Sequence, residues 1–173
     1  MLPAPGANGP AIPTPAPTGR PADPAAVSVI RGWSGALLRG EVGRAAAYFA
    51  LPSQFINGAG PGGVPVISIH SLRDAEAVDA TLPCGAKFIS ADQRGRYVDA
   101  LFRLADRPGP GGACGAGAGQ LARTNFLISH GRIVQWIRAP NDPGDNRGQP
   151  TPPGAPGAPG QPTPSAPGGN PVA

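Results

Sequence analysis

Residues 120–138, QLARTNFLISHGRIVQWIR, decide the fold because they form two alternating apolar runs joined by His130-Gly131. A tight two-residue turn needs backbone conformations with positive φ, which glycine adopts without steric cost. The stretch therefore predicts a β-hairpin that turns at these two residues. Both faces of this hairpin carry large apolar side chains, so helices must cover one face. A pocket, a partner subunit or further protein must cover the other.

The position of the turn sets which residues oppose each other across the predicted hairpin. On one face the expected pairs are Ile128–Ile133, Phe126–Gln135 and Thr124–Ile137. On the other face they are Leu127–Val134, Asn125–Trp136 and Arg123–Arg138. The second face would thus have an apolar centre with an arginine pair at its far end.

Composition divides the 173-residue chain into three parts. Residues 1–22 and 141–173 are rich in Pro, Gly and Ala. They hold too few large apolar side chains to offset the entropy of ordering, so we expect disordered tails. Residues 23–140 contain all five Phe, both Trp, both Tyr and both Cys. This central part predicts one domain with a modest core.

The charge pattern argues against two classes of partner. The net charge is +4, but the arginines are scattered singly, with no basic run and no stacking aromatics between them. Thirteen Arg beside a single Lys are typical of GC-rich coding, and scattered arginines form no nucleic-acid footprint, so we expect no nucleic-acid binding. No apolar run approaches the roughly 18 residues of a membrane span, and Met1 is followed by proline-rich sequence, so we expect neither a span nor a signal peptide in this chain.

Helical spacing and capping residues predict three early helices. Asp23-Pro24 is a good helix start, and Ile30, Trp33 and Leu37 then repeat at helical spacing. A second helix is expected over residues 41–50, EVGRAAAYFA. Ser71 and Asp74 form a capping box that opens a third helix, which ends at Pro83.

Alternating segments predict about six strands, most of them late in the chain. The first four are expected over residues 53–57, 64–70, 87–91 and 96–104, and the opening hairpin supplies the last two. Helices that come mostly first and strands that come mostly later predict an α+β domain with an antiparallel sheet.

The two cysteines lie where this topology brings them together. Cys84 precedes one strand of the predicted hairpin at residues 87–104, and Cys114 lies in the glycine-rich loop after it. A disulfide would close about 30 residues, whereas the alternative is two unlinked buried thiols. Two Cys and two His at unsuitable spacing predict no zinc site. A disulfide favours an oxidising compartment, so we expect an extracytoplasmic or secreted protein, with a cytoplasmic one as the alternative.

The order of these motifs resembles the nuclear transport factor 2-like superfamily, in particular its SnoaL-like proteins. The resemblance rests on Trp33 in the first helix, GEVGRAAAYFA at residues 40–50, and the strand pair from Phe126 to Trp136. It implies a cone-like, cystatin-like roll, in which a curved sheet wraps around the helices and leaves a pocket at its open end. Members include ketosteroid isomerases, polyketide cyclases, epoxide hydrolases and dehydratases, but also non-catalytic binders and dimerisation modules, so the fold does not select a function.

Asp99 is the candidate catalytic residue. A carboxylate that faced an apolar cone would have a raised pKa and could act as a general base, as the resemblance implies for isomerases and cyclases. The competing interpretation is a salt bridge that relieves the pair of Arg123 and Arg138 on neighbouring strands.

Five residues are candidates for binding a small hydrophobic or ring-containing ligand by stacking and hydrogen bonds: Tyr48, Tyr97, Arg123, Asn125 and Trp136. No cofactor is expected. An apolar centre with an arginine rim is also typical of a subunit interface, so a homodimer through the 120–138 hairpin is an equal alternative. The sequence thus leaves three functions open: a ligand-binding domain, an enzyme that uses Asp99, and a homodimeric interaction module.

Overall fold

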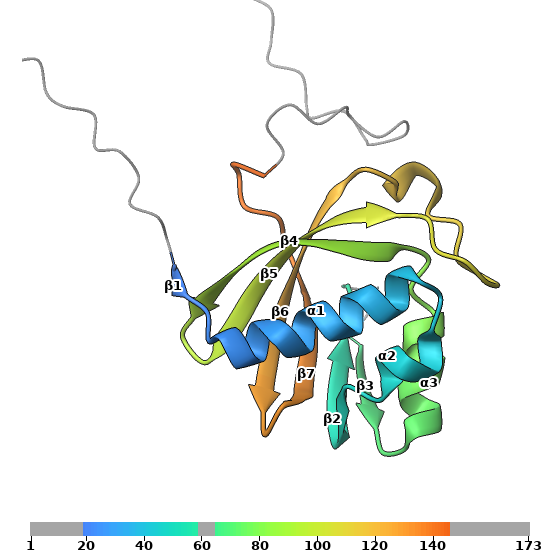
Figure 1. Ribbon diagram of the computed structural model, residues 1–173, viewed down its shortest axis with the longest axis horizontal. Helices are drawn as coiled ribbons and strands as arrows, with labels where there is room; N and C mark the ends of the chain where they lie inside the picture. The colour runs from blue at the N-terminus through green and yellow to red at the C-terminus, as the bar shows by residue number, and fades with distance from the viewer. Residues whose placement is uncertain (1–18, 59–64, 146–173) are drawn as a thin grey trace, which may run out of the picture.

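Three α-helices lie on one side of a curved sheet in the computed structural model, which describes residues 19–58 and 65–145 (Figure 1). The helices are α1 (Pro24–Leu38), α2 (Val42–Ala46) and α3 (Leu72–Ala80). The strands are β1 (Arg20–Pro21), β2 (Phe49–Ile56), β3 (Val66–Ile69), β4 (Gly85–Arg94), β5 (Tyr97–Ala105), β6 (Leu121–Ser129) and β7 (Arg132–Ala139). The predicted α+β class with a curved sheet wrapped around three helices is confirmed.

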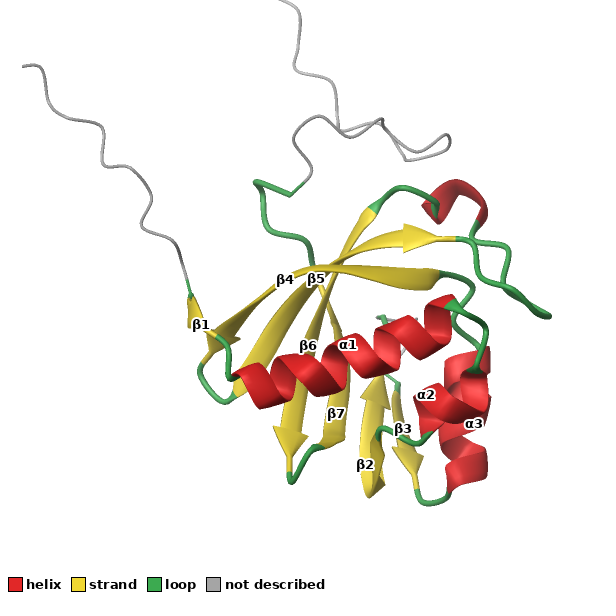
Figure 2. Ribbon diagram, in the orientation of Figure 1, coloured by secondary structure: helices red, strands yellow, loops and turns green. Residues whose placement is uncertain are grey.

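The seven strands of the described chain form one sheet in the order β1-β4-β5-β6-β7-β2-β3. Neighbours run antiparallel except β2 and β7, which are parallel. Figure 2 shows α1 crossing the inside of the curve, with α2 and α3 beside β2 and β3. The sheet therefore has an inner face, turned toward α1, and an outer face.

The first helix forms where its capping residues predict. The Asp23 carboxylate accepts a hydrogen bond from the backbone N–H of Ala25 at 3.0 Å, and Pro24 occupies the first turn. Gly40, at φ 74°, follows the helix end, where the left-handed conformation suits glycine. The apolar stripe is buried against the inner face: Ile30, Trp33 and Leu37.

The second helix is shorter than its sequence predicts. We expected residues 41–50 to be helical, but α2 ends at Ala46 and β2 already begins at Phe49. The backbone N–H of Ile133 donates to the Tyr48 carbonyl at 2.8 Å, and Phe49 pairs with Ile133. Pairing with β7 thus draws these residues into the sheet, so tertiary contacts override local helix propensity.

The third helix has the capping box that the sequence predicts. Ser71 Oγ accepts from the backbone N–H of Asp74 at 3.2 Å, and the Asp74 carboxylate accepts from the backbone N–H of Ser71 at 2.9 Å. Just before it, β3 is an edge strand. Pro65 precedes β3, which is a position where a missing backbone N–H costs nothing.

The 120–138 hairpin turns as predicted, but the predicted register is wrong beyond its first pairs. His130 (φ 49°) and Gly131 (φ 70°) form the turn, and Ile128 pairs with Ile133. A bulge then shifts the register by one residue. The remaining pairs are Leu127–Gln135, Phe126–Trp136, Asn125–Ile137, Thr124–Arg138 and Arg123–Ala139.

Burial of Trp136 explains the bulge. Ile133 and Trp136 both face inward and are 0% and 3% exposed, although an odd spacing of three residues puts side chains on opposite faces of a regular strand. The extra residue, Val134, returns Trp136 to the inner face beside Phe126. The same shift turns Arg138 inward, whereas the predicted register placed both residues on the other face.

Aromatic side chains fill the core between α1 and the sheet. The Trp33 ring makes edge contacts with Phe102, Phe126 and Trp136, with ring centres 6.2, 5.5 and 6.2 Å apart. Phe55 stacks on Trp136 at 4.3 Å. No helix in the described part of the chain is long and apolar enough to cross a membrane.

Contacts extend beyond residues 23–140 on both sides. Strand β1 pairs with β4, and the Asp145 carboxylate accepts a hydrogen bond from Arg123 Nη2 at 2.9 Å. Residues 1–18 and 146–173 of the two predicted tails lie outside the described chain.

Candidate functional site

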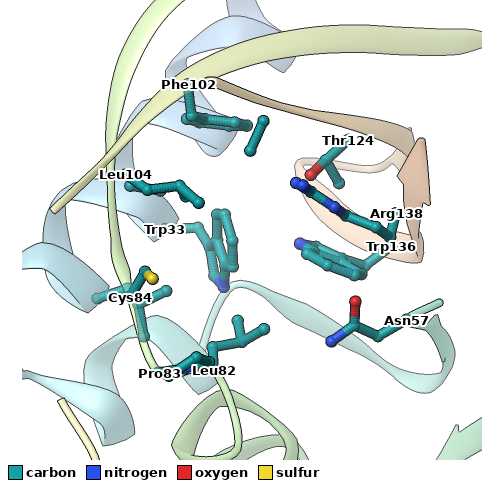
Figure 3. Close-up of a pocket in the computed structure, with 13 residues that line it drawn as sticks. Trp33, Asn57, Leu82, Pro83, Cys84, Phe102, Leu104, Thr124, Trp136 and Arg138 are labelled. Carbon is teal, nitrogen blue, oxygen red and sulfur yellow. The ribbon is translucent and has the colours of Figure 1, made fainter. Parts of the chain in front are cut away.

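A cavity of about 150 Å³ lies between α1 and the inner face of the sheet (Figure 3). Helix α1 contributes Trp33, strands β5 and β6 contribute Phe102 and Thr124, and β7 contributes Trp136 and Arg138. The segment 82–86 closes one side. An engineered protein cavity of similar volume binds benzene, so this one has room for a single small ring.

One side of the cavity is apolar and carries the disulfide. Leu82, Leu104 and Cys84 lie on this side in Figure 3, next to Trp33. The predicted Cys84–Cys114 disulfide is present. A Cβ atom on Gly117 would lie 3.1 and 3.2 Å from the two sulfur atoms, so a residue without a side chain lets the loop pack this closely on the bridge.

The opposite side carries the polar groups. Figure 3 shows the Thr124 hydroxyl, the Arg138 guanidinium and the indole nitrogen of Trp136 turned toward the same space. Trp136 Nε1 is buried, and no residue in the described ranges accepts its hydrogen bond. Burial lowers the pKa of the Arg138 guanidinium, and no described carboxylate forms an ion pair with it.

The other tryptophan of the cavity has a polar partner that the sequence analysis missed. Trp33 Nε1 donates to Asp79 Oδ1 at 3.1 Å, and Asp79 is fully buried. Burial raises the pKa of Asp79 to about 7, although the Trp33 hydrogen bond and the charge of Arg107 oppose the shift. One signal was present in the sequence, because Asp79 occupies the apolar stripe of α3 four residues after Ala75.

Replacement of Asp79 by asparagine should flatten the dependence of stability on pH. Between about pH 4 and 7 the native state keeps a proton on Asp79 that the unfolded chain releases, so the stability of the wild type falls as pH rises through this window. Asparagine keeps the acceptor for Trp33 without the charge. We expect Asp79→Asn to be more stable than the wild type by about 3–4 kcal/mol at pH 8 and nearly equal to it at pH 4, where the protonated carboxyl, like the amide, carries a donor without an acceptor.

Urea unfolding at pH 4, 6 and 8 measures this difference. The exposed Glu76, changed to glutamine, serves as the control for loss of one carboxylate. An equal stability change at all three pH values would contradict the account of Asp79.

Asp99, the candidate base, lies on the outer face of β5 and does not line the cavity. It is 2% exposed and accepts a hydrogen bond from Arg123 Nη1. Arg123 also binds Asp145, and this hydrogen bond is the main cause of its raised pKa. Asp99 therefore forms a salt bridge with Arg123, which is the contact that the competing interpretation expects.

Of the five predicted ligand-binding residues, Trp136 lines the cavity and the other four do not. Arg123 is bound to Asp99, and Tyr97 Oη donates to Gln135 Oε1 at 2.9 Å. Tyr48 packs on α1, where a Cβ on Gly32 would lie 2.3 Å from its hydroxyl. Asn125 lies on the outer face in the Arg123 row of β6.

The sequence analysis missed Arg138 as a cavity residue because it rested on a regular hairpin. The predicted register paired Arg138 with Arg123 at the rim of a dimer interface. The bulge at Val134 puts Arg138 on the inner face, opposite Thr124. Trp136, the expected centre of that interface, is 3% exposed within the single chain. The homodimer stays a prediction, but Trp136 is not available as the centre of its interface.

The sequence matches no protein-family model, and a search of curated proteins finds no match. Solved structures of similar shape include a SnoaL-like protein of unknown function from Burkholderia thailandensis, with 15% identity over 68% of this chain and 96% of that one, at a TM-score of 0.46. An NTF2-like protein of unknown function from Cytophaga hutchinsonii has 11% identity over 70% and 92%, at 0.47.

A third solved structure is a protein with a ketosteroid isomerase-like fold from Catenulispora acidiphila, in complex with trimethylamine. It has 12% identity over 64% of this chain and 83% of that chain, at a TM-score of 0.45. These three proteins are of the kinds that the sequence pattern resembles. At such identities the likeness concerns the fold alone.

Proposed function

We propose that this protein binds a small apolar, ring-containing molecule in the cavity and performs no chemistry on it. The observation that supports this most is that both tryptophans of the chain line one cavity, and that Trp136 turns an unpaired N–H into it. A buried donor without an acceptor costs about 1–3 kcal/mol. A ligand that supplied an acceptor would recover this cost while it covered the apolar wall.

The chemistry of the lining residues favours binding over catalysis. The described residues that line the cavity include no carboxylate, no imidazole and no free thiol, because Cys84 is in the disulfide. A general base must come within hydrogen-bond distance of the proton that it removes. Asp99, which the isomerase alternative requires, lies across the sheet from the cavity and is bound to Arg123.

Toluene tests this proposal as a small apolar probe. We expect it to change the tryptophan fluorescence of the wild type and to raise its Tm in a saturable way, because binding to the native state alone stabilises it. Ala122 lines the cavity and is 1% exposed, so Ala122→Leu should fill the space and abolish both effects.

The matched control is Ala47→Leu, the same substitution at an exposed position outside the cavity, which should respond like the wild type. A toluene response that persisted in a folded Ala122→Leu protein would place the binding elsewhere. No response in the wild type would refute the proposal, whatever the variants do.

An extracytoplasmic site of action accompanies this proposal. The Cys84–Cys114 disulfide is compatible with an oxidising compartment. We expect the two cysteines of the protein in its native cells to resist alkylation until a reductant is added. Free alkylation of both thiols would favour the cytoplasmic alternative.

A further inference from the structure

The Arg138 guanidinium has few hydrogen-bond acceptors among the described residues. It lies on the inner face of β7 and lines the cavity. The one hydrogen bond that the described residues offer it runs from Nη1 to the Arg123 carbonyl, at a long 3.5 Å. A guanidinium has five N–H donors, so most of its capacity is unused.

The two buried arginines of the described chain, Arg107 and Arg123, have more partners than the half-buried Arg138. Arg107 Nη2 donates to the Leu82 carbonyl at 2.8 Å and to the Ala80 carbonyl at 3.3 Å. Arg123 binds the carboxylates of Asp99 and Asp145. Arg138 has neither kind of arrangement within the described chain. Its guanidinium therefore keeps donors that a ligand in the cavity can use.

The second unpaired donor points to the same place. Trp136 precedes Arg138 by two residues on β7, so both side chains project from the same face. In Figure 3 the indole nitrogen and the guanidinium face one region of the cavity, with the Thr124 hydroxyl beside them. A buried N–H without an acceptor, beside a half-buried guanidinium, suits an anionic acceptor.

We propose that the ligand is a small organic acid, whose ring or short branched chain fills the apolar side of the cavity and whose carboxylate binds Arg138 and the indole N–H of Trp136. This inference rests on the proposed function and names its ligand class. The cavity volume of about 150 Å³ limits the apolar part to roughly one ring. A planar carboxylate matches the forked donors of a guanidinium.

Benzoate and benzamide, measured side by side, test the assignment at pH 7. They have nearly the same shape and differ in charge. We expect the wild type to bind benzoate about tenfold or more tightly than benzamide, since hydrogen bonds to charged groups are stronger than neutral ones by an energy that corresponds to about tenfold in affinity. Arg138→Gln should remove this preference and leave the affinity for benzamide nearly unchanged. Trp136→Phe removes the indole N–H but keeps an aromatic ring in the wall, so it should lower the affinity for benzoate severalfold.

Arg96→Gln is the matched control, because it removes the same charge from an exposed turn. It should retain the wild-type preference. Equal binding of benzoate and benzamide by the wild type would overturn the inference, and so would an unchanged preference in a folded Arg138→Gln protein. Toluene separates the two proposals. If toluene binds and benzoate gains nothing, the acid assignment fails alone; if none of the three probes binds, the proposed function fails with it.

Discussion

Replacement of Arg123 by alanine is expected to lower the free energy of unfolding by about 3–5 kcal/mol. Asp99 is 2% exposed on the outer face of the sheet, and Arg123 is its principal charged partner. Arg94 Nη2 lies 3.8 Å away, too far for a hydrogen bond. Alanine would thus leave a buried carboxylate without a donor, and such a charge costs far more than a lost surface ion pair.

The size of the loss depends on Asp99, which a double-mutant cycle can show. In an Asp99→Ala background the same Arg123→Ala change should cost less, because only the Asp145 carboxylate then loses its partner. Arg103 lies on the same face of β5, is exposed, and donates to the Gly119 carbonyl at 3.0 Å. Arg103→Ala should cost less than about 0.5 kcal/mol. Urea unfolding of the wild type, the three single variants and the double variant gives these costs. Equal costs of Arg123→Ala in the two backgrounds would contradict the salt-bridge role of Asp99.

Removal of the disulfide is expected to cost about 3–4 kcal/mol. The bridge joins residues 30 positions apart, and the chain-entropy model gives this value for a loop of that length. It also anchors the glycine-rich segment after β5, where the Asp106 carboxylate accepts from the backbone N–H of Cys114 at 2.7 Å. A variant with Cys84→Ser and Cys114→Ser should therefore unfold at lower urea.

Reductant gives an independent measurement of the same effect. Dithiothreitol should destabilise the wild type by nearly the same amount and leave the double serine variant unchanged. A wild type that is indifferent to dithiothreitol while its thiols become alkylated would show that the bridge adds nothing to stability. Because Cys84 lines the cavity, the double variant should also bind toluene more weakly.

Local signals in the sequence predicted the parts of the fold that local chemistry determines. The Asp23-Pro24 start, the Ser71 capping box and the His130-Gly131 turn each satisfy specific backbone groups nearby, so they can be identified from a few residues. The disulfide followed from topology, since one hairpin brings Cys84 beside the loop that holds Cys114.

The missed features depend on contacts between distant segments. Alternation alone does not reveal the bulge at Val134, because its cause is the burial of Trp136 against Trp33 and Phe55. This one residue decides which face Trp136 and Arg138 occupy, and hence the composition of the cavity wall. The early end of α2 has the same kind of cause, namely the pairing of Phe49 with β7.

Asp79 and Asp99 show why a buried carboxylate needs its surroundings before it has a role. Asp99 stood out in the sequence, yet the structure pairs it with Arg123 on the outer face. Asp79 received no role, yet it is fully buried and holds the indole of a cavity tryptophan. Both carboxylates position other side chains. The groups that line the cavity are donors and apolar surfaces, which suits binding.

The two indole N–H signals in a ¹H–¹⁵N NMR spectrum report on the cavity most directly. The chain has two tryptophans, and Trp136→Phe assigns their signals by removing one. On titration with benzoate, we expect the Trp136 signal to move far and to saturate as its unpaired N–H gains an acceptor. The Trp33 signal should move less, because this N–H already donates to Asp79. If both indole signals stay still while toluene and benzoate are added to high concentration, the cavity does not bind these ligands and the account is wrong.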